Sequence, residues 1–342
     1  MNINLEEFSL GRHQAPKGSL QKVGIVGCGI MGQQIALQTS QYGIDVVFLD
    51  LTEERIKEIF DRLNAELDRV IKKWGMTPGE KKLILSRIQG TTSYADLKDC
   101  DIVIETINSK KSGTSLTFRQ EVFRKLDEVL RPDAVIASNT ATLMISELST
   151  MLKNPGRAIG LHFISPVRDV KIVEVVRSLR TSPETWDFAC KYVRMIGKEV
   201  IPVNESPGNI STRMIIPFIN EACAILMEGV AAVEDIDKTM REASGHLMGP
   251  FEMADTIGLD KLLRWMENLY TEFGELRYKP SPSTLNSRPS LRLCLMDAPL
   301  SPILSTRHLA ITSAEGMSKS WYFMDELPQF STMIFILLYF FH

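Results

Sequence analysis

The chain has 342 residues, of which 44% are hydrophobic and 24% are charged. These proportions are typical of a globular protein that folds as one large or two ordinary domains. The formal net charge is −3 and no basic cluster with interleaved aromatic residues occurs, which excludes a general affinity for nucleic acid. The five cysteines are scattered without C-x-x-C spacing, so we expect reduced core residues.

The two ends of the chain differ from the rest. Residues 1–20 lack the apolar core of a secretory signal and are interpreted as an N-terminal extension of a cytoplasmic protein. Residues 288–342 have no sustained period and end in the nine apolar residues MIFILLYFF, whereas a membrane helix needs about 20. No membrane span is expected. This atypical tail could be a buried strand, a sticky end, or sequence that was not selected to fold with the rest.

Residues 22–50 have the pattern of a dinucleotide-binding unit. An apolar run at 23–26 predicts a buried strand, three glycines follow with G-x-G-x-x-G spacing, and a helix and a second strand at 46–49 come next. The first helical turn offers unpaired N–H groups to a pyrophosphate, and the acid after the second strand favours NAD over NADP. The residues expected to bind the cofactor here are Gly27, Gly29, Ile30, Met31, Gly32 and Asp50.

The next part of the chain alternates helices and strands. Amphipathic residues 53–74 and a short helix at 79–88 predict a helical hairpin that projects from the fold. Further strands are expected at 101–105, 134–138, 158–163, 171–176 and 199–203, with helices at 117–130 and 182–196. This alternation predicts an α/β fold with a doubly wound, mostly parallel sheet of the Rossmann type. Short links between the last strands allow some antiparallel pairing.

Only helical periodicity appears beyond Asn204, at 210–228, 233–243 and 251–273. A smaller all-α domain is therefore expected to follow the sheet. The predicted domains are an extension at 1–20, a Rossmann domain at 21–205, a helical substrate and dimerisation domain at 206–287, and the tail at 288–342.

His162 is the histidine best placed for chemistry. It ends a predicted strand, and ligands of open α/β sheets bind at the carboxyl ends of strands. Glu174 lies between valines on the next strand, so its carboxylate should be buried and needs a partner. Such a pair could move a proton while hydride passes to a nicotinamide, although a structural His–Glu pair in the core is an equal alternative. No metal-ligand spacing such as H-x-x-H occurs, so no metal site is expected.

Five blocks in order resemble the 3-hydroxyacyl-CoA dehydrogenase family, and in particular the 3-hydroxybutyryl-CoA dehydrogenases. They are GCGIMG with Asp50, SNTATLMISEL, LHFISPVRDVKIVEVV, GKEVIPVNESPGNISTR and GHLMGPFEMADTIGLD. The resemblance covers roughly residues 21–285. It implies an oxidoreductase of fatty acid metabolism that works as a homodimer and oxidises a 3-hydroxyacyl thioester to the 3-oxoacyl thioester with NAD.

The resemblance also implies roles for individual residues. His162 would be the general acid/base and Glu174 its partner. Glu105 and Asn139 would contact the cofactor. The residues implied near the substrate are Ser138, Ala141, Ser165 and Thr212.

Three of these substrate positions depart from the family pattern. Ala141 stands where the family has serine, Ser165 where it has asparagine in HFFNP, and Thr212 where it has asparagine in PGFxxNR. An insertion at 108–118 blurs the register of a family lysine, and the C-terminal GRKTGxGFY block is missing. The sequence leaves two alternatives open: a dehydrogenase of hydroxyacyl groups on an acyl carrier protein, or a low-activity NAD-binding structural relative.

Overall fold

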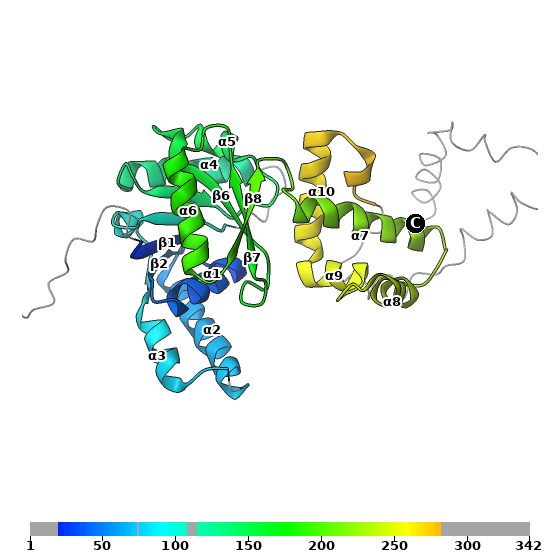
Figure 1. Ribbon diagram of the computed structural model, residues 1–342, viewed down its shortest axis with the longest axis horizontal. Coiled ribbons are helices and arrows are strands. Elements are labelled where there is room, and N and C mark those ends of the chain that lie inside the picture. The colour runs from blue at the N-terminus through cyan, green and yellow to red at the C-terminus, as the bar shows by residue number, and fades with distance from the viewer. Residues whose placement is uncertain (1–19, 74, 108–114, 282–342) are drawn as a thin grey trace, which may run out of the picture. The chain divides into compact units, whose positions relative to one another are not determined.

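The computed structural model describes residues 20–73, 75–107 and 115–281 (Figure 1). It divides into two compact units. The larger runs to Phe218 and also takes Asp260–Pro280, and the smaller contains Ile219–Leu259. The predicted extension at 1–20 falls outside the described ranges except for Leu20, and the tail at 288–342 falls outside them entirely.

One eight-stranded sheet organises the larger unit. Its strands are β1 (Lys22–Val26), β2 (Asp45–Leu49), β3 (Ile88–Thr91), β4 (Ile102–Glu105), β5 (Val135–Ser138), β6 (Ala158–Phe163), β7 (Ile172–Arg177) and β8 (Glu199–Asn204). Their spatial order is β3-β2-β1-β4-β5-β6-β7-β8. Neighbours are parallel except β6 and β7, which are antiparallel. The order reverses between β1 and β4, and a doubly wound sheet binds its ligand at such a switch point.

Alternation along the strands gives each face of the sheet its own core. Helices α1 (Ile30–Gln41), α2 (Glu53–Lys72) and α6 (Pro183–Met195) cover one face, and α4 (Ser115–Val129) and α5 (Ile145–Ser149) cover the other. On β6, Ile159, Leu161 and Phe163 join the first core. His162 therefore points to the α4–α5 face, because side chains on a strand alternate.

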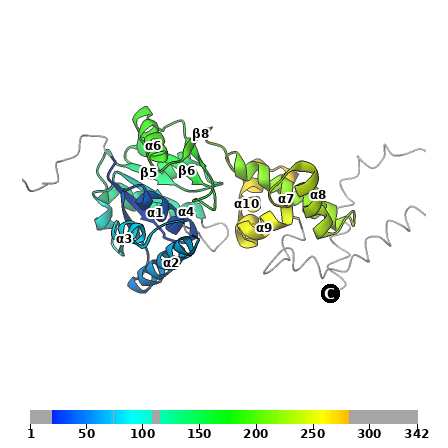
Figure 2. The ribbon, with the colours of Figure 1, turned by 60° about the horizontal axis from the view of Figure 1, so that its bottom comes forward.

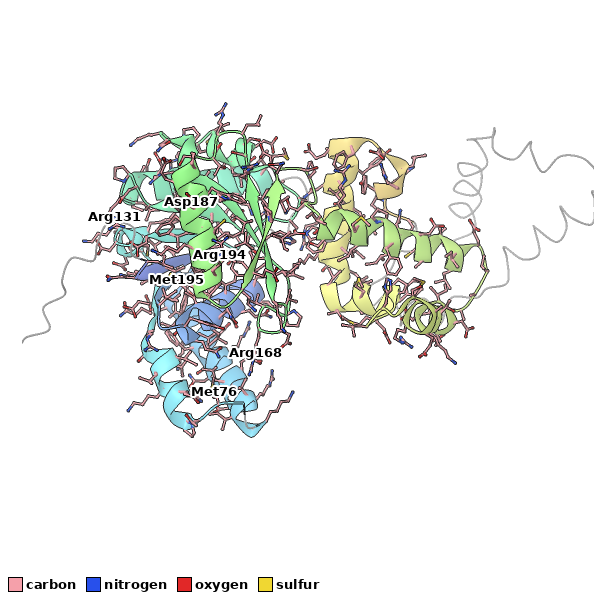
Figure 3. All side chains as sticks on the ribbon, viewed as in Figure 1. Met76, Arg131, Arg168, Asp187, Arg194 and Met195 are labelled. Carbon is pink, nitrogen blue, oxygen red and sulfur yellow. The ribbon has the colours of Figure 1, made fainter. Side chains whose placement is uncertain are left out.

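Helix α6 illustrates how a surface helix is fixed by its pattern. Ser182 caps its first turn, and Ala189 and Val193 are buried against the sheet. Asp187 and Arg194 are exposed on the opposite side of the helix (Figure 3). This is the one-sided burial that a period of 3.6 residues predicts.

The predicted helical hairpin is present. Helix α2 and helix α3 (Pro78–Ser86) run beside each other (Figures 1 and 2). Thr52 caps α2, and Thr77 with Glu80 forms a capping box on α3. The sequence does not predict β3, because the helical pattern at 79–88 extends across its first residue, and IQGT is too short and too polar to signal a strand.

The remaining helices are α7 (Ser211–Met227), α8 (Val233–Ser244), α9 (Pro250–Ile257) and α10 (Leu259–Phe273). The prediction of a single helix at 251–273 was wrong. The helix is interrupted at Gly258, whose φ of +91° is incompatible with a continuing helix. Asp237 of α8 accepts the backbone N–H groups of Phe251 and Glu252, which ties α8 to the start of α9.

The predicted domain limit at residue 205 falls between β8 and α7, whereas the compact units part within α7. None of the helices in the described ranges combines the length and apolarity that crossing a bilayer requires. Within the same ranges, no three His, Cys, Asp or Glu side chains gather as a metal site.

Candidate active site

The loop between β1 and α1 is shaped by its glycines. Gly27 has a φ of +83°, and a Cβ on it would lie 2.6 Å from Cγ1 of Ile107. A Cβ on Gly32 would lie 2.7 Å from the carbonyl oxygen of Gly27. A Cβ on Gly29 would meet nothing within 4 Å. The protein's own packing thus requires two of the glycines, and the third leaves open space that a ligand can enter.

That open space lies at the start of α1. Gly29 is its N-cap and provides no side-chain hydrogen bond to the first turn. Ile30 is 73% exposed, so the first turn is accessible to solvent. A helix start with unpaired N–H groups and no capping side chain suits a phosphate.

Asp50 closes the unit at the end of β2. Its Oδ2 accepts the N–H of Cys28 at 3.1 Å and its Oδ1 accepts the N–H of Leu51 at 2.9 Å. These bonds fix the carboxylate beside the glycine loop and leave lone pairs for ribose hydroxyls. The glycine loop, the uncapped helix and this acid together fit a dinucleotide with an unphosphorylated ribose, which is NAD.

His162 and Glu174 form a buried pair on the α4–α5 face. They are directly opposed in the antiparallel register of β6 and β7, so their side chains leave the same face of the sheet. Nδ1 of His162 lies 2.7 Å from Oε2 of Glu174, and the side chains are only 7% and 3% exposed. A carboxylate at Nδ1 favours the tautomer with hydrogen on Nδ1, which leaves the lone pair on Nε2.

Ser211, the first residue of α7, completes the surroundings of Glu174. Its N–H donates to Oε1 at 2.8 Å, and its Oγ donates to Oε2 at 3.2 Å. Burial works to raise the pKa of Glu174, but the hydrogen bonds from His162 and Ser211 outweigh it and hold the pKa below its ordinary value. The carboxylate is therefore ionised at neutral pH.

Glu105 and Ser138 end the neighbouring strands β4 and β5 and contact each other. Oγ of Ser138 donates to Oε2 of Glu105 at 2.6 Å, and Nε of Arg119 lies 2.9 Å from the same oxygen. Oε1 of Glu105 accepts the N–H of Ile107 at 2.5 Å. The carboxylate is fully buried, so these contacts compensate its charge.

The other predicted residues lie around these strand ends. Oδ1 of Asn139 accepts the N–H of Phe163 at 2.8 Å, which links β5 to the residue after His162. Ala141 is buried in the loop after β5, and Ser165 is exposed three residues after His162. Thr212 is only 1% exposed and follows Ser211 on α7. The fold thus gathers the predicted residues from β4, β5, β6, β7 and α7 within the larger unit.

Sequence reasoning missed two members of this site. In the block NISTR the resemblance to the family assigns a role only to Thr212, but a hydroxyl at a helix start is also a capping signal, and this signal indicates Ser211. Arg119 was missed because the insertion at 108–118 obscured its register. Its guanidinium binds Glu105 and also donates to the carbonyl of Ile107 at 2.6 Å.

A Rossmann sheet, a glycine loop that fits NAD, and a His–Glu pair near the carboxyl end of β6 define an NAD-dependent dehydrogenase. The family model described as 3-hydroxyacyl-CoA dehydrogenase, NAD binding domain, matches residues 22–206, and its C-terminal domain model matches 208–288. The chain belongs to the 3-hydroxyacyl-CoA dehydrogenase family.

Named relatives agree with this assignment. The 3-hydroxybutyryl-CoA dehydrogenase of Clostridioides difficile is 38% identical over 261 residues, which are 76% of this chain and 91% of that protein. The one from Bradyrhizobium diazoefficiens is 37% identical, covering 77% and 88%. The crystal structure of (S)-3-hydroxybutyryl-CoA dehydrogenase from Ralstonia eutropha superposes with a TM-score of 0.72 at 37% identity, covering 78% and 93%.

Proposed function

We propose that this protein oxidises a short 3-hydroxyacyl-CoA, such as 3-hydroxybutyryl-CoA, to the 3-oxoacyl-CoA with His162 as general base. The observation that carries the proposal is the buried His162–Glu174 pair, 2.7 Å apart, near the carboxyl end of β6, where β4 and β5 also end. The short acyl group is taken from the printed names of the relatives.

The chain's own groups would act as follows. Nε2 of His162, the ring nitrogen that Glu174 leaves unengaged, takes the proton of the 3-hydroxyl as C3 loses hydride. Bound NAD supplies the acceptor for that hydride. Glu174 stabilises the resulting imidazolium through Nδ1–H, and Ser211 holds Glu174 in place. The glycine loop and Asp50 hold the pyrophosphate and the ribose. In the reverse direction the imidazolium returns the proton to the 3-oxo oxygen.

The substrate contacts proposed for Ala141, Ser165 and Thr212 lack the family's serine and two asparagines. A missing hydroxyl contact costs about 1–3 kcal/mol of transition-state binding. This corresponds to about 5- to 150-fold in rate. We therefore expect a slower enzyme rather than an inactive one. The retained His–Glu pair supports an enzyme over a purely structural NAD binder, because buried titratable pairs are costly to keep without a use.

The test is NADH oxidation by the purified protein with acetoacetyl-CoA, with a blank and a His162→Ala control. Oxidation that depends on His162, with NADH affinity unchanged in the variant, supports the proposal. Absence of oxidation while NADH binds tightly by fluorescence contradicts it for CoA substrates. An acetoacetyl group on acyl carrier protein is then the second substrate to try, and turnover of that substrate alone would reassign the carrier.

We also propose a homodimer formed by the helical part of the chain. Its support is the resemblance together with apolar side chains exposed on or beside the helices, namely Met214, Val230 and Leu247, which are 71%, 66% and 96% exposed. A monomer mass by light scattering at micromolar concentration would contradict this.

A further inference from the structure

The carboxylate of Glu174 receives more hydrogen bonds than the His162 pairing alone requires. Oε1 is bound by the N–H of Ser211, and Oε2 is shared between Nδ1 of His162 at 2.7 Å and Oγ of Ser211 at 3.2 Å. Ser211 is thus joined to both oxygens through two separate donors. An ordinary helix cap uses its side chain on its own helix, whereas both donors of this serine point at a strand residue 37 positions earlier.

We propose that Ser211 is a positioning residue that fixes the Glu174 carboxylate and lowers the proton affinity of His162 by competing for Oε2. The proposal rests on the acid/base role given above to His162 and Glu174. It is supported by the hydroxyl of Ser211, which donates to the same carboxylate oxygen that contacts the imidazole.

The direction of the effect follows from shared charge. A carboxylate oxygen that accepts a hydroxyl hydrogen bond has less negative charge to stabilise an imidazolium. Without the hydroxyl, the imidazolium is stabilised more and His162 holds its proton to a higher pH. Hydrogen bonds from both His162 and Ser211 lower the pKa of Glu174, so both groups draw on the charge of the same carboxylate.

The backbone N–H of Ser211 has a different task. It cannot rotate away, and it donates to Oε1 whatever side chain is present. Replacing the side chain therefore removes only the bond to Oε2 and leaves the carboxylate anchored at the other oxygen. This separation allows the hydroxyl to be tested without releasing Glu174.

The experiment uses the full chain with the isosteric pair Ser211→Thr, which keeps a hydroxyl, and Ser211→Val, which does not. Ser211→Ala is added in case the larger side chains disturb α7. Ser86→Ala is the control, because its exposed hydroxyl only bonds the carbonyl of Leu83 on α3. The pH profile of 3-hydroxybutyryl-CoA oxidation is measured for each protein. The titration of His162 is followed independently by NMR of histidine-labelled protein and assigned with His162→Gln.

We expect Ser211→Val and Ser211→Ala to move the acid limb and the NMR midpoint upward by about half a pH unit, a roughly threefold change in the neutral fraction. Ser211→Thr and Ser86→Ala should follow the wild type. Equal titrations of the Thr and Val variants would overturn the proposal, even with normal turnover. Lack of turnover in every protein would instead refute the proposed function, and the NMR midpoints would still decide the role of Ser211.

Discussion

Replacing Glu174 by glutamine gives the sharpest test of the proton-transfer pair. The side chain keeps its shape but gains an NH2 group, which must replace one of the two oxygens. At the Oε1 position it would face the N–H of Ser211, a backbone donor 2.8 Å away that cannot turn. At the Oε2 position it faces Nδ1 of His162, while the hydroxyl of Ser211 can rotate to accept from it. The second arrangement is favoured, because only there can the neighbours adapt.

The consequence is a reversed tautomer of His162. Nδ1 must become the acceptor, so the ring hydrogen moves to Nε2 and the lone pair no longer faces the substrate. The imidazolium, with hydrogen on both nitrogens, also loses its counter-charge. A hydrogen bond to a charged group contributes about 1.5–3 kcal/mol, or roughly 10- to 150-fold in rate. The corresponding change in Ser-His-Asp triads, where the tautomer also reverses, costs about 10⁴-fold. We expect a loss in kcat between about 10²-fold and 10⁴-fold.

The assay is steady-state NADH oxidation with acetoacetyl-CoA between pH 6 and 9, beside a fluorescence titration of NADH binding. Glu184→Gln is the matched control, because Glu184 is an exposed carboxylate in the first turn of α6. The Glu174 variant should bind NADH as the wild type does. A kcat within about tenfold of wild type at every pH would refute the tautomer argument and would mean that the His162–Glu174 pair has a structural role.

Three further outcomes follow from the site. Ala141→Ser restores the family hydroxyl and should raise kcat/KM by about 5- to 150-fold; no gain would mean that the acyl oxygen is bound elsewhere. Asp50→Ala should lower the affinity for NADH by roughly tenfold or more in a fluorescence titration, and an unchanged affinity would contradict the ribose contact. Because the pKa of Glu174 is depressed in the folded state, its charge contributes stability above the ordinary pKa of 4.5, and that contribution disappears as pH falls through the folded value. In urea unfolding, the difference in free energy of unfolding between wild type and Glu174→Gln should therefore become smaller below pH 4.5. A difference that stays constant with pH would exclude the charge of Glu174 as its cause.

Local chemistry in the sequence determined the cofactor unit. The glycine spacing, the apolar runs on both sides and Asp50 are all within 29 residues, so each constraint acts between near neighbours. The same is true of β6, predicted at 158–163 and found at Ala158–Phe163, because the mostly apolar run AIGLHF is itself a strand signal. The sequence does not predict the interruption at Gly258, because the hydrophobic periodicity continues across this residue whereas the helical backbone conformation does not.

Contacts between distant segments were decided only by the tertiary structure. The sequence offered His162 and Glu174 as neighbours, but their direct opposition required β7 to run antiparallel to β6 in one particular register. Ser211 reaches Glu174 on β7 from the start of α7, and Arg119 reaches Glu105 across the insertion. Hydrogen bonds need donor and acceptor within about 3 Å, and nothing in a pattern of residue types fixes that distance between segments so far apart. The residues proposed to carry the chemistry could therefore be predicted from the sequence, whereas the groups that hold them in place became evident only from the packing of the sheet and α7.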